Sequence, residues 1–270
     1  MVGLPGNIAS RELELFSPNW FILENGNTSL LKILFVNNVR TVSDTKKTFY
    51  TLHTRPINTI YRRVVEELMV EMHLLSVNVD FSYDGIYALG VVTTFDRFMA
   101  GYQPEQDQES IFQAICHAVE QDPHRYRQDA SRLQALAAKV PVQDLIAGLS
   151  QATLLNQDAD LQRQLEAIAA NSNFKYSRLF AIGLFALLAE SDPALVKDDT
   201  QRTEALKTIA KGLHLSEDKL IKDLELYSSN LEKMAQALIV MADILSADRK
   251  KRDQRQQQAE TTTAPSSINE

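Results

Sequence analysis

The sequence predicts an all-α protein: a single multi-helix domain followed by a long, coiled-coil-like C-terminal helix. Three observations support this fold class. Apolar residues recur at helical spacing from about residue 41 onward, whereas no segment shows the alternation of a half-buried strand. Only nine of the 270 residues are glycine and eight are proline, fewer than a turn-rich β-sandwich or barrel needs. Near the C-terminus, a heptad pattern continues for about three and a half repeats.

The N-terminal segment differs from the rest of the chain. It contains the only tryptophan, Trp20, and shows no sustained helical or strand period. We therefore expect residues 1–36 to be an extension that is disordered or lies upstream of the true translation start. The helical domain is expected over residues 37–215 and the long helix over residues 216–258. The polar composition of residues 259–270 predicts a disordered tail.

The first helix is expected over residues 44–52, with Ser43 as its N-cap. Pro56 should separate it from the next helix, because the residue before a proline avoids the α region. The second helix is expected to begin at Pro56 and to end near residues 77–80. Its apolar residues follow the i, i+3, i+4, i+7 series of a stripe that faces the core. They are Ile57, Ile60, Tyr61, Val64, Val65, Leu68, Met69, Met72 and Leu75.

Asp84 is a suitable N-cap for a third helix, in which apolar residues recur up to Gly101. The same reasoning predicts further helices over residues 110–120, 123–139, 142–150, 159–170, 176–189 and 201–213. The 176–189 helix is apolar on nearly every side, which is typical of a helix at the centre of a core. The predicted core includes Leu68, Met69, Leu89, Val92, Phe180, Leu184 and Phe185.

The last helix, expected over residues 217–258, carries apolar residues at alternating intervals of four and three. This spacing predicts a coiled-coil seam that docks along the domain or along a partner helix. The seam residues are Leu220, Leu224, Tyr227, Leu231, Met234, Leu238, Met241 and Leu245. The next seam positions are Asp248 and Arg252, so packing should end at Leu245 while the helix continues.

A basic cluster follows the seam and consists of Arg249, Lys250, Lys251, Arg252 and Arg255. Its position complements the dipole at a helix C-terminus, which is one explanation. Contact with an acidic protein or with an anionic membrane surface is the other. Because the helix should be longer than the domain, we predict that its exposed part binds a partner. The predicted binding residues are Leu231, Met234, Leu238, Met241, Leu245 and the basic cluster.

The composition excludes several classes of protein. Lys and Arg total 28 against 35 Asp and Glu, a net charge of −7, whereas domains that bind nucleic acid are usually basic. The single cysteine, Cys116, cannot form an internal disulfide or a cysteine-based zinc site, and its spacing favours a place in the core. No apolar run reaches the roughly 20 residues that a membrane-spanning helix needs.

Glu66, Glu67, Glu71 and His73 are the densest set of potential metal ligands. The Glu-x-x-His spacing of a helical di-iron site is absent, so a solvated helix face with charge pairs is the favoured interpretation. A helical metal-dependent enzyme is the alternative, and metal analysis of the purified protein would distinguish the two. No catalytic motif was found, and we expect no enzyme, no cofactor and no small-molecule substrate.

Four segments together resemble a known protein family over a much longer stretch than a single motif. They are SDTKKTFY (residues 43–50), TRPINTIYRRVVEELMVEMHLL (54–75), VNVDFSYDGIYALGVV (77–92) and FDRFMAGY (95–102). Together they resemble the thylakoid formation protein family of oxygenic phototrophs, and weaker similarity continues to the coiled-coil end. The resemblance implies an all-helical auxiliary protein on the cytoplasmic side of the thylakoid membrane. It also implies action with a membrane-bound FtsH-type protease in photosystem II biogenesis and repair. A peripheral, membrane-organising protein that binds anionic lipid is the alternative.

Overall fold

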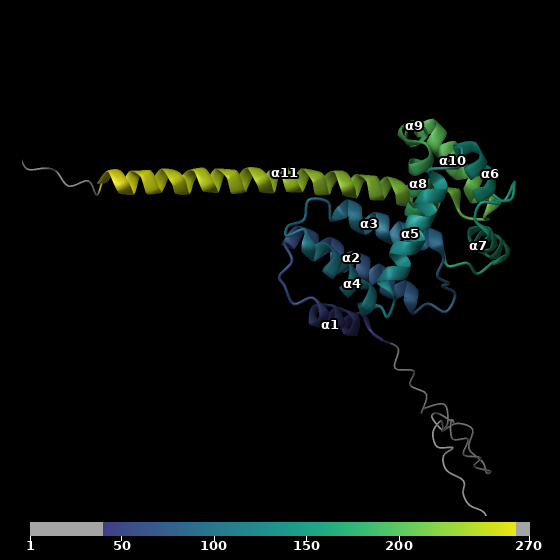
Figure 1. Ribbon diagram of the computed structural model, residues 1–270, viewed down its shortest axis with the longest axis horizontal. Coiled ribbons are helices and arrows are strands. Elements are labelled where there is room, and N and C mark those ends of the chain that lie inside the picture. Colours follow the sequence, from purple (N-terminus) through teal and green to yellow (C-terminus); the bar gives the residue numbers. More distant parts are fainter. Residues whose placement is uncertain (1–39, 263–270) are drawn as a thin grey trace, which may run out of the picture. The chain divides into compact units, whose positions relative to one another are not determined.

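The computed structural model describes residues 40–262, which form eleven helices and no strand (Figure 1). The predicted all-α class is therefore confirmed for this part of the chain. The extension predicted over residues 1–36 lies outside the described residues. In chain order the helices are α1 (Val42–Leu52), α2 (Thr59–Ser76), α3 (Gly85–Phe98), α4 (Gln106–Ala118), α5 (Pro123–Ala137), α6 (Val142–Leu149), α7 (Ala159–Ala170), α8 (Arg178–Ser191), α9 (Pro193–Lys197), α10 (Asp199–Gly212) and α11 (Glu217–Thr262).

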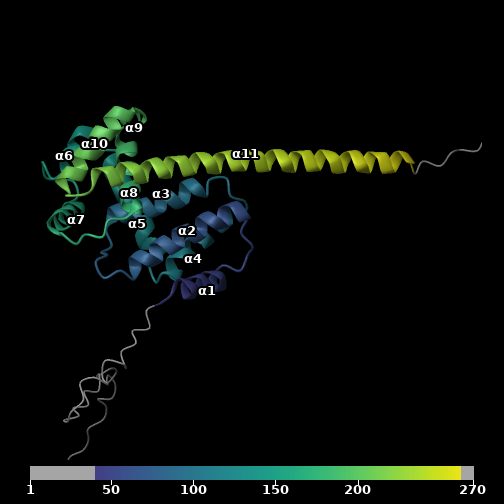
Figure 2. The same ribbon diagram turned by 180° about the vertical axis from the view of Figure 1, so that it is seen from behind.

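The centre of the domain is the contact between α3 and α8, against which α5 also packs. Both central helices are buried around most of their circumference, as their apolar sequences predict. The remaining helices form two groups around this pair. Figures 1 and 2 show α1, α2 and α4 at one end of the domain and α6, α7, α9 and α10 at the other.

The predicted core is confirmed for six of its seven residues, which are Leu68, Met69, Leu89, Val92, Phe180 and Leu184. Phe185 is the exception, because it is only partly buried and packs at the edge of the core. It lines an open hollow beside Arg202 of α10 and Leu224 of α11. The apolar character of α8 on every side did not distinguish this edge position from the centre.

Two predicted helix starts are wrong by a few residues, and side-chain caps explain both. Helix α1 is capped by Thr41 and not by Ser43, because Thr41 and Asp44 form a capping box in which each side chain accepts the other residue's backbone N–H. Helix α2 begins after Asn58, whose side chain accepts from the Ile60 N–H at 3.1 Å, so Pro56 lies outside the helix. The Asp84 cap of α3 is confirmed.

Other boundaries also differ from the prediction. Helix α4 begins at Gln106, earlier than expected, and its first turn contains the buried Asp107, which pairs with Arg55 at 2.5 Å. The five-residue helix α9 was not predicted, because a single turn has no periodicity. It is capped by Asp192.

Helix α11 packs on the domain through α8, α10 and α3. Its seam is buried at Leu220, Leu224 and Tyr227 and partly buried at Leu231, Met234 and Leu238. Met241 still reaches the domain, where its Sδ accepts a hydrogen bond from Asn58 Nδ2 at 3.6 Å. The seam therefore docks along its own domain, and the helix continues past it (Figure 1).

The predicted end of the last helix is wrong. Helix α11 continues to Thr262 and not to residue 258, so the first four residues of the predicted tail are helical. Ala259 and Glu260 are good helix formers and follow the glutamines of residues 256–258, so they extend the helix, whereas the two threonines that end it favour helix less. Residues 263–270 lie outside the described residues.

Replacing Leu184 with alanine should test the predicted centre of the core. Leu184 is fully buried in α8, so we expect unfolding to become easier by about 2 to 5 kcal/mol, through lost burial and a residual cavity. Reversible urea unfolding, monitored by circular dichroism, measures this difference. A loss below about 1 kcal/mol would show that the neighbouring helices collapse around the site.

Candidate interaction surfaces

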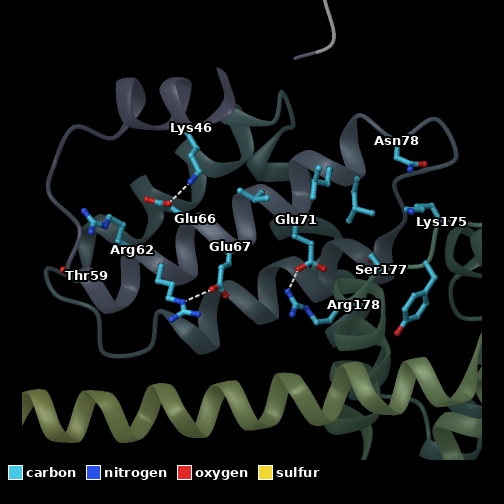
Figure 3. A pocket seen from close by; sticks show the side chains of 15 residues that line it. Lys46, Thr59, Arg62, Glu66, Glu67, Glu71, Asn78, Lys175, Ser177 and Arg178 are labelled. Atoms are coloured by element: carbon cyan, nitrogen blue, oxygen red, sulfur yellow. Dashed lines mark hydrogen bonds and ion pairs between the residues drawn. The ribbon is translucent and has the colours of Figure 1, made fainter. Parts of the chain in front are cut away.

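A large hollow runs along the exposed side of α2 (Figure 3) and has a volume of about 1090 Å³. We call it the α2 groove. Lys46 of α1 and residues 175–178, which lead into α8, complete its walls. Its apolar surface comes from Val70, Leu74 and Leu75.

Three ion pairs occupy the glutamates of the α2 groove. Lys46 Nζ lies 2.8 Å from Glu66 Oε2, and Arg63 Nε lies 2.9 Å from Glu67 Oε1. The third pair joins Glu71 to Arg178 of α8. Each carboxylate is therefore already neutralised by a neighbouring side chain.

Glu66 is the most strongly held of these carboxylates. It also accepts a hydrogen bond from the Tyr50 hydroxyl at 2.6 Å. The hydrogen bonds from Lys46 and Tyr50 stabilise the charged form and lower the pKa of Glu66. Burial and the adjacent carboxylate raise the pKa of Tyr50 to about 12, so this hydroxyl stays protonated and donates.

The four potential metal ligands of α2 do not converge. His73 faces away from the groove, is buried, and bonds through Nδ1 to Thr45 Oγ1 at 2.9 Å. Burial lowers the pKa of His73, which favours the neutral ring. Within residues 40–262, no group of three or more His, Cys, Asp or Glu side chains could hold a metal ion. These observations favour the predicted charge-paired face for the glutamates and not the metal site.

Two basic side chains of the α2 groove have no carboxylate partner within the described part of the chain. They are Arg62 and Lys175, and both are exposed. Figure 3 shows them near opposite ends of the groove. This arrangement could not be predicted from local sequence patterns, because Lys175 comes close to α2 only through the fold.

The exposed end of α11 is the second candidate surface. All five residues of the basic cluster are exposed. Three large apolar side chains are exposed where the helix leaves the domain: Ile239 at 62%, Val240 at 57% and Ile244 at 57%. These three residues were not predicted as exposed apolar surface, because they lie off the heptad seam. The partner-binding role predicted for the seam and the basic cluster stays a prediction.

Cys116 is fully buried in α4, which confirms its predicted place in the core. Burial raises the pKa of the Cys116 thiol to about 12. The thiolate is the reactive form, so this side chain is inert near neutral pH. Among residues 40–262, no helix combines the length and apolar character needed to cross a membrane.

These features define a class: an all-helical protein with a charged groove and an exposed helix end on the described part of its surface. The chain belongs to the thylakoid formation protein family, whose model matches residues 41–256. This match confirms the resemblance found in the sequence. Membership of the family supports a role in the biogenesis of thylakoids and photosystem II.

Similar proteins cover almost the whole family region. Protein Thf1 of Trichormus variabilis is 79% identical over 227 residues, which are 84% of this chain and 97% of that relative. Protein Thf1 of Nostoc punctiforme is 75% identical over 235 residues, 87% of this chain and all of the relative. A solved structure of Psb29 at 1.55 Å matches with a TM-score of 0.68 and 44% identity, and covers 79% of this chain and 99% of that chain.

Proposed function

We propose that the protein is a non-catalytic auxiliary factor in photosystem II biogenesis and repair. In this proposal it acts with, and stabilises, a membrane-bound FtsH-type protease on the cytoplasmic side of the thylakoid membrane. Family membership supports the connection to thylakoids. The main structural support for an interaction is that α11 continues past the domain and exposes its basic cluster there (Figure 1).

The two parts of α11 have different roles in this proposal. The seam up to Leu238 holds the helix on its own domain. The exposed Val240 and Ile244 supply apolar contact area beyond it, and exposed apolar groups of this kind are common at protein interfaces. The basic cluster then attracts an acidic surface over a distance, which raises the encounter rate and makes it sensitive to salt.

A non-catalytic role agrees with the interactions that the reactive side chains make in the fold. Glu66 and Glu71 are held in ion pairs, and the Cys116 thiol is buried and protonated. The groups best suited to acid–base or nucleophilic chemistry therefore support the fold.

An anionic membrane surface is a second candidate partner for the same helix end. The juxtaposition of exposed Val240 and Ile244 with the basic cluster favours it, because peripheral helices combine apolar insertion with basic residues. Five basic residues would add at most about 5 kcal/mol, enough for reversible attachment. Co-sedimentation with neutral and anionic vesicles over a salt series separates this candidate from a protein partner.

Ending the chain after Leu245 should weaken the protease interaction without unfolding the domain. Because the packed seam lies before this point, we expect the thermal midpoint to stay within a few degrees of wild type. Reversing the charges of Lys250, Lys251 and Arg252 should have the same effect. In a deletion strain, neither variant should restore protease abundance and photosystem II recovery after strong light as fully as the complete chain does.

The matched control reverses three exposed lysines elsewhere on the domain: Lys139, Lys207 and Lys211. It changes the net charge equally and should leave pull-down of the protease unchanged. The proposal is wrong if the shortened chain pulls down the protease as well as wild type does. Normal protease abundance and photosystem II turnover in the deletion strain would also contradict it.

A further inference from the structure

We propose that the α2 groove binds an acidic peptide segment of a partner protein, separately from the exposed end of α11. The proposal rests on the charge, the size and the apolar surface of the groove. It requires no contact with the protease, so it stands or falls apart from the proposed function.

The charge of the groove opposes that of the whole protein. Five basic side chains and three glutamates line it, whereas the complete chain has a net charge of −7. Because the three glutamates are paired within the groove, the uncompensated charge belongs to Arg62 and Lys175. An anionic ligand is therefore favoured locally by a surface that is otherwise acidic.

The spacing of the two free cations indicates an extended ligand. Arg62 lies in the first turn of α2, and Lys175 lies beside the other end of the helix (Figure 3). At 1.5 Å per residue, the intervening thirteen residues of α2 correspond to about 20 Å. An extended peptide spans this distance in about six residues. Two acidic positions separated by a short peptide would thus reach both cations.

The size and surface of the groove favour a polypeptide. Its volume of about 1090 Å³ lies at the upper end of the range for small-molecule sites, but the groove is open to solvent, whereas such sites enclose most of their ligand. Leu74, which also lines the groove, is 56% exposed and offers a contact for an apolar side chain of the peptide. Within the described part of the chain, only the two ends of the groove carry an uncompensated cation, which suits a peptide with carboxylates at its ends better than the regularly spaced phosphates of a nucleic acid.

The side chains also suggest how the peptide is held. Arg62 can bind a carboxylate in a bidentate manner, which gives direction as well as charge. Glu66 is hydrogen-bonded to Lys46 and Tyr50, and the nearby Arg62 acts on it only through its charge, so the Arg62 guanidinium can still donate hydrogen bonds to the ligand. Both end contacts are solvent-exposed, and their strength should fall as salt is added.

The test measures binding of a fluorescein-labelled peptide to the full chain by fluorescence anisotropy. The probe has about ten residues, with a pair of glutamates at each end and leucine and serine between them. The comparison peptide carries lysine in place of every glutamate. We expect the acidic probe to bind and the basic peptide to bind at least about tenfold more weakly.

Variants of the full chain test whether the probe binds in the α2 groove. The double variant Arg62→Glu, Lys175→Glu should lower the affinity for the acidic probe by about tenfold or more. Leu74→Ala should lower it by about threefold. Because all three side chains are exposed, these changes should leave the thermal midpoint near wild type. The matched charge control, Lys207→Glu with Lys211→Glu, should keep the affinity within about twofold. Leu154→Ala, at another exposed leucine, is the control for Leu74→Ala.

Three outcomes overturn the proposal. The first is equal binding of the acidic and basic peptides, or no binding of either. The second is undiminished binding to the Arg62→Glu, Lys175→Glu chain. The third is loss of binding in the chain that ends after Leu245, which would place the probe on the basic cluster. A chain shortened in this way that keeps its affinity for the probe supports the α2 groove even if the protease interaction is absent.

Discussion

Replacing Gly90 with alanine is expected to destabilise the domain by about 3 kcal/mol or more. Gly90 lies in α3 where this helix crosses α8, and a Cβ atom there would lie 1.7 Å from the backbone oxygen of Leu179. The reciprocal position, Gly183 of α8, would place its Cβ 1.9 Å from the Ile86 oxygen. Backbone atoms cannot rotate away as a side chain can, so the two helices would have to separate.

A destabilising effect of Gly90→Ala would indicate a close helix crossing, because the same change usually has the opposite sign. In an ordinary helix interior, changing glycine to alanine stabilises by up to about 1 kcal/mol. Gly85→Ala is the matched control in the same helix, because its Cβ would meet only side-chain atoms, Leu133 Cδ1 at 3.2 Å and Arg132 Nη2 at 3.3 Å. We expect the control to change stability by less than about 1 kcal/mol in urea unfolding. A Gly90→Ala protein as stable as the control would show that the crossing is not close.

Replacing Asp84 with asparagine should stabilise the protein above neutral pH. Asp84 is only 5% exposed, and its carboxylate accepts the Tyr87 N–H at 2.7 Å as the N-cap of α3. Burial raises the pKa of Asp84 from 3.8 to about 7, against the opposing effect of the backbone hydrogen bonds. Asparagine is an equally good N-cap, so the variant keeps this hydrogen bond and removes the buried charge.

The direction of the pH dependence follows from the raised pKa. Between about pH 4 and pH 7, the unfolded chain has lost the Asp84 proton while the folded protein keeps it, so stability falls as the pH rises. Three pH units correspond to about 4 kcal/mol at most. We expect the free energy of unfolding of Asp84→Asn to exceed that of wild type by about 2 kcal/mol or more at pH 8. At pH 4 the two values should agree within about 1 kcal/mol.

Urea unfolding of both proteins from pH 4 to pH 8 measures this difference, because subtraction cancels titrations that the two proteins share. Asp84→Ala is the control, since it removes the cap together with the charge. It should therefore be less stable than Asp84→Asn at every pH. Parallel stability curves for wild type and Asp84→Asn would contradict the assignment of a buried, titrating carboxyl.

Local features of the sequence were sufficient for most of the fold. Helix α7 has the predicted boundaries, and the Asp84 cap of α3 was identified correctly. Caps and periodicity act within a few residues of one another, so they can be found without knowledge of the fold. Helix α9 was missed because its five residues provide a cap but no period.

The candidate surfaces were only partly predictable. The basic cluster was identified as an exposed run of charge, and all five of its residues are exposed. The α2 groove was not predicted, although Glu66, Glu67 and Glu71 were noted as a dense set. Their partners include Lys46 of α1 and Arg178 of α8, which are distant in sequence. Which cations remain unpaired depends on these long-range contacts.

The sequence by itself determined the helical class, the central position of α8, the seam of α11 and the family resemblance, because each is encoded in local spacing or in a continuous motif. Only the tertiary structure decided that the seam packs on its own domain and that Gly90 and Gly183 meet at one crossing. It also decided that Phe185 lies at the edge of the core. The physical reason is that packing depends on distances between separate helices, and those distances result from the whole chain folding together.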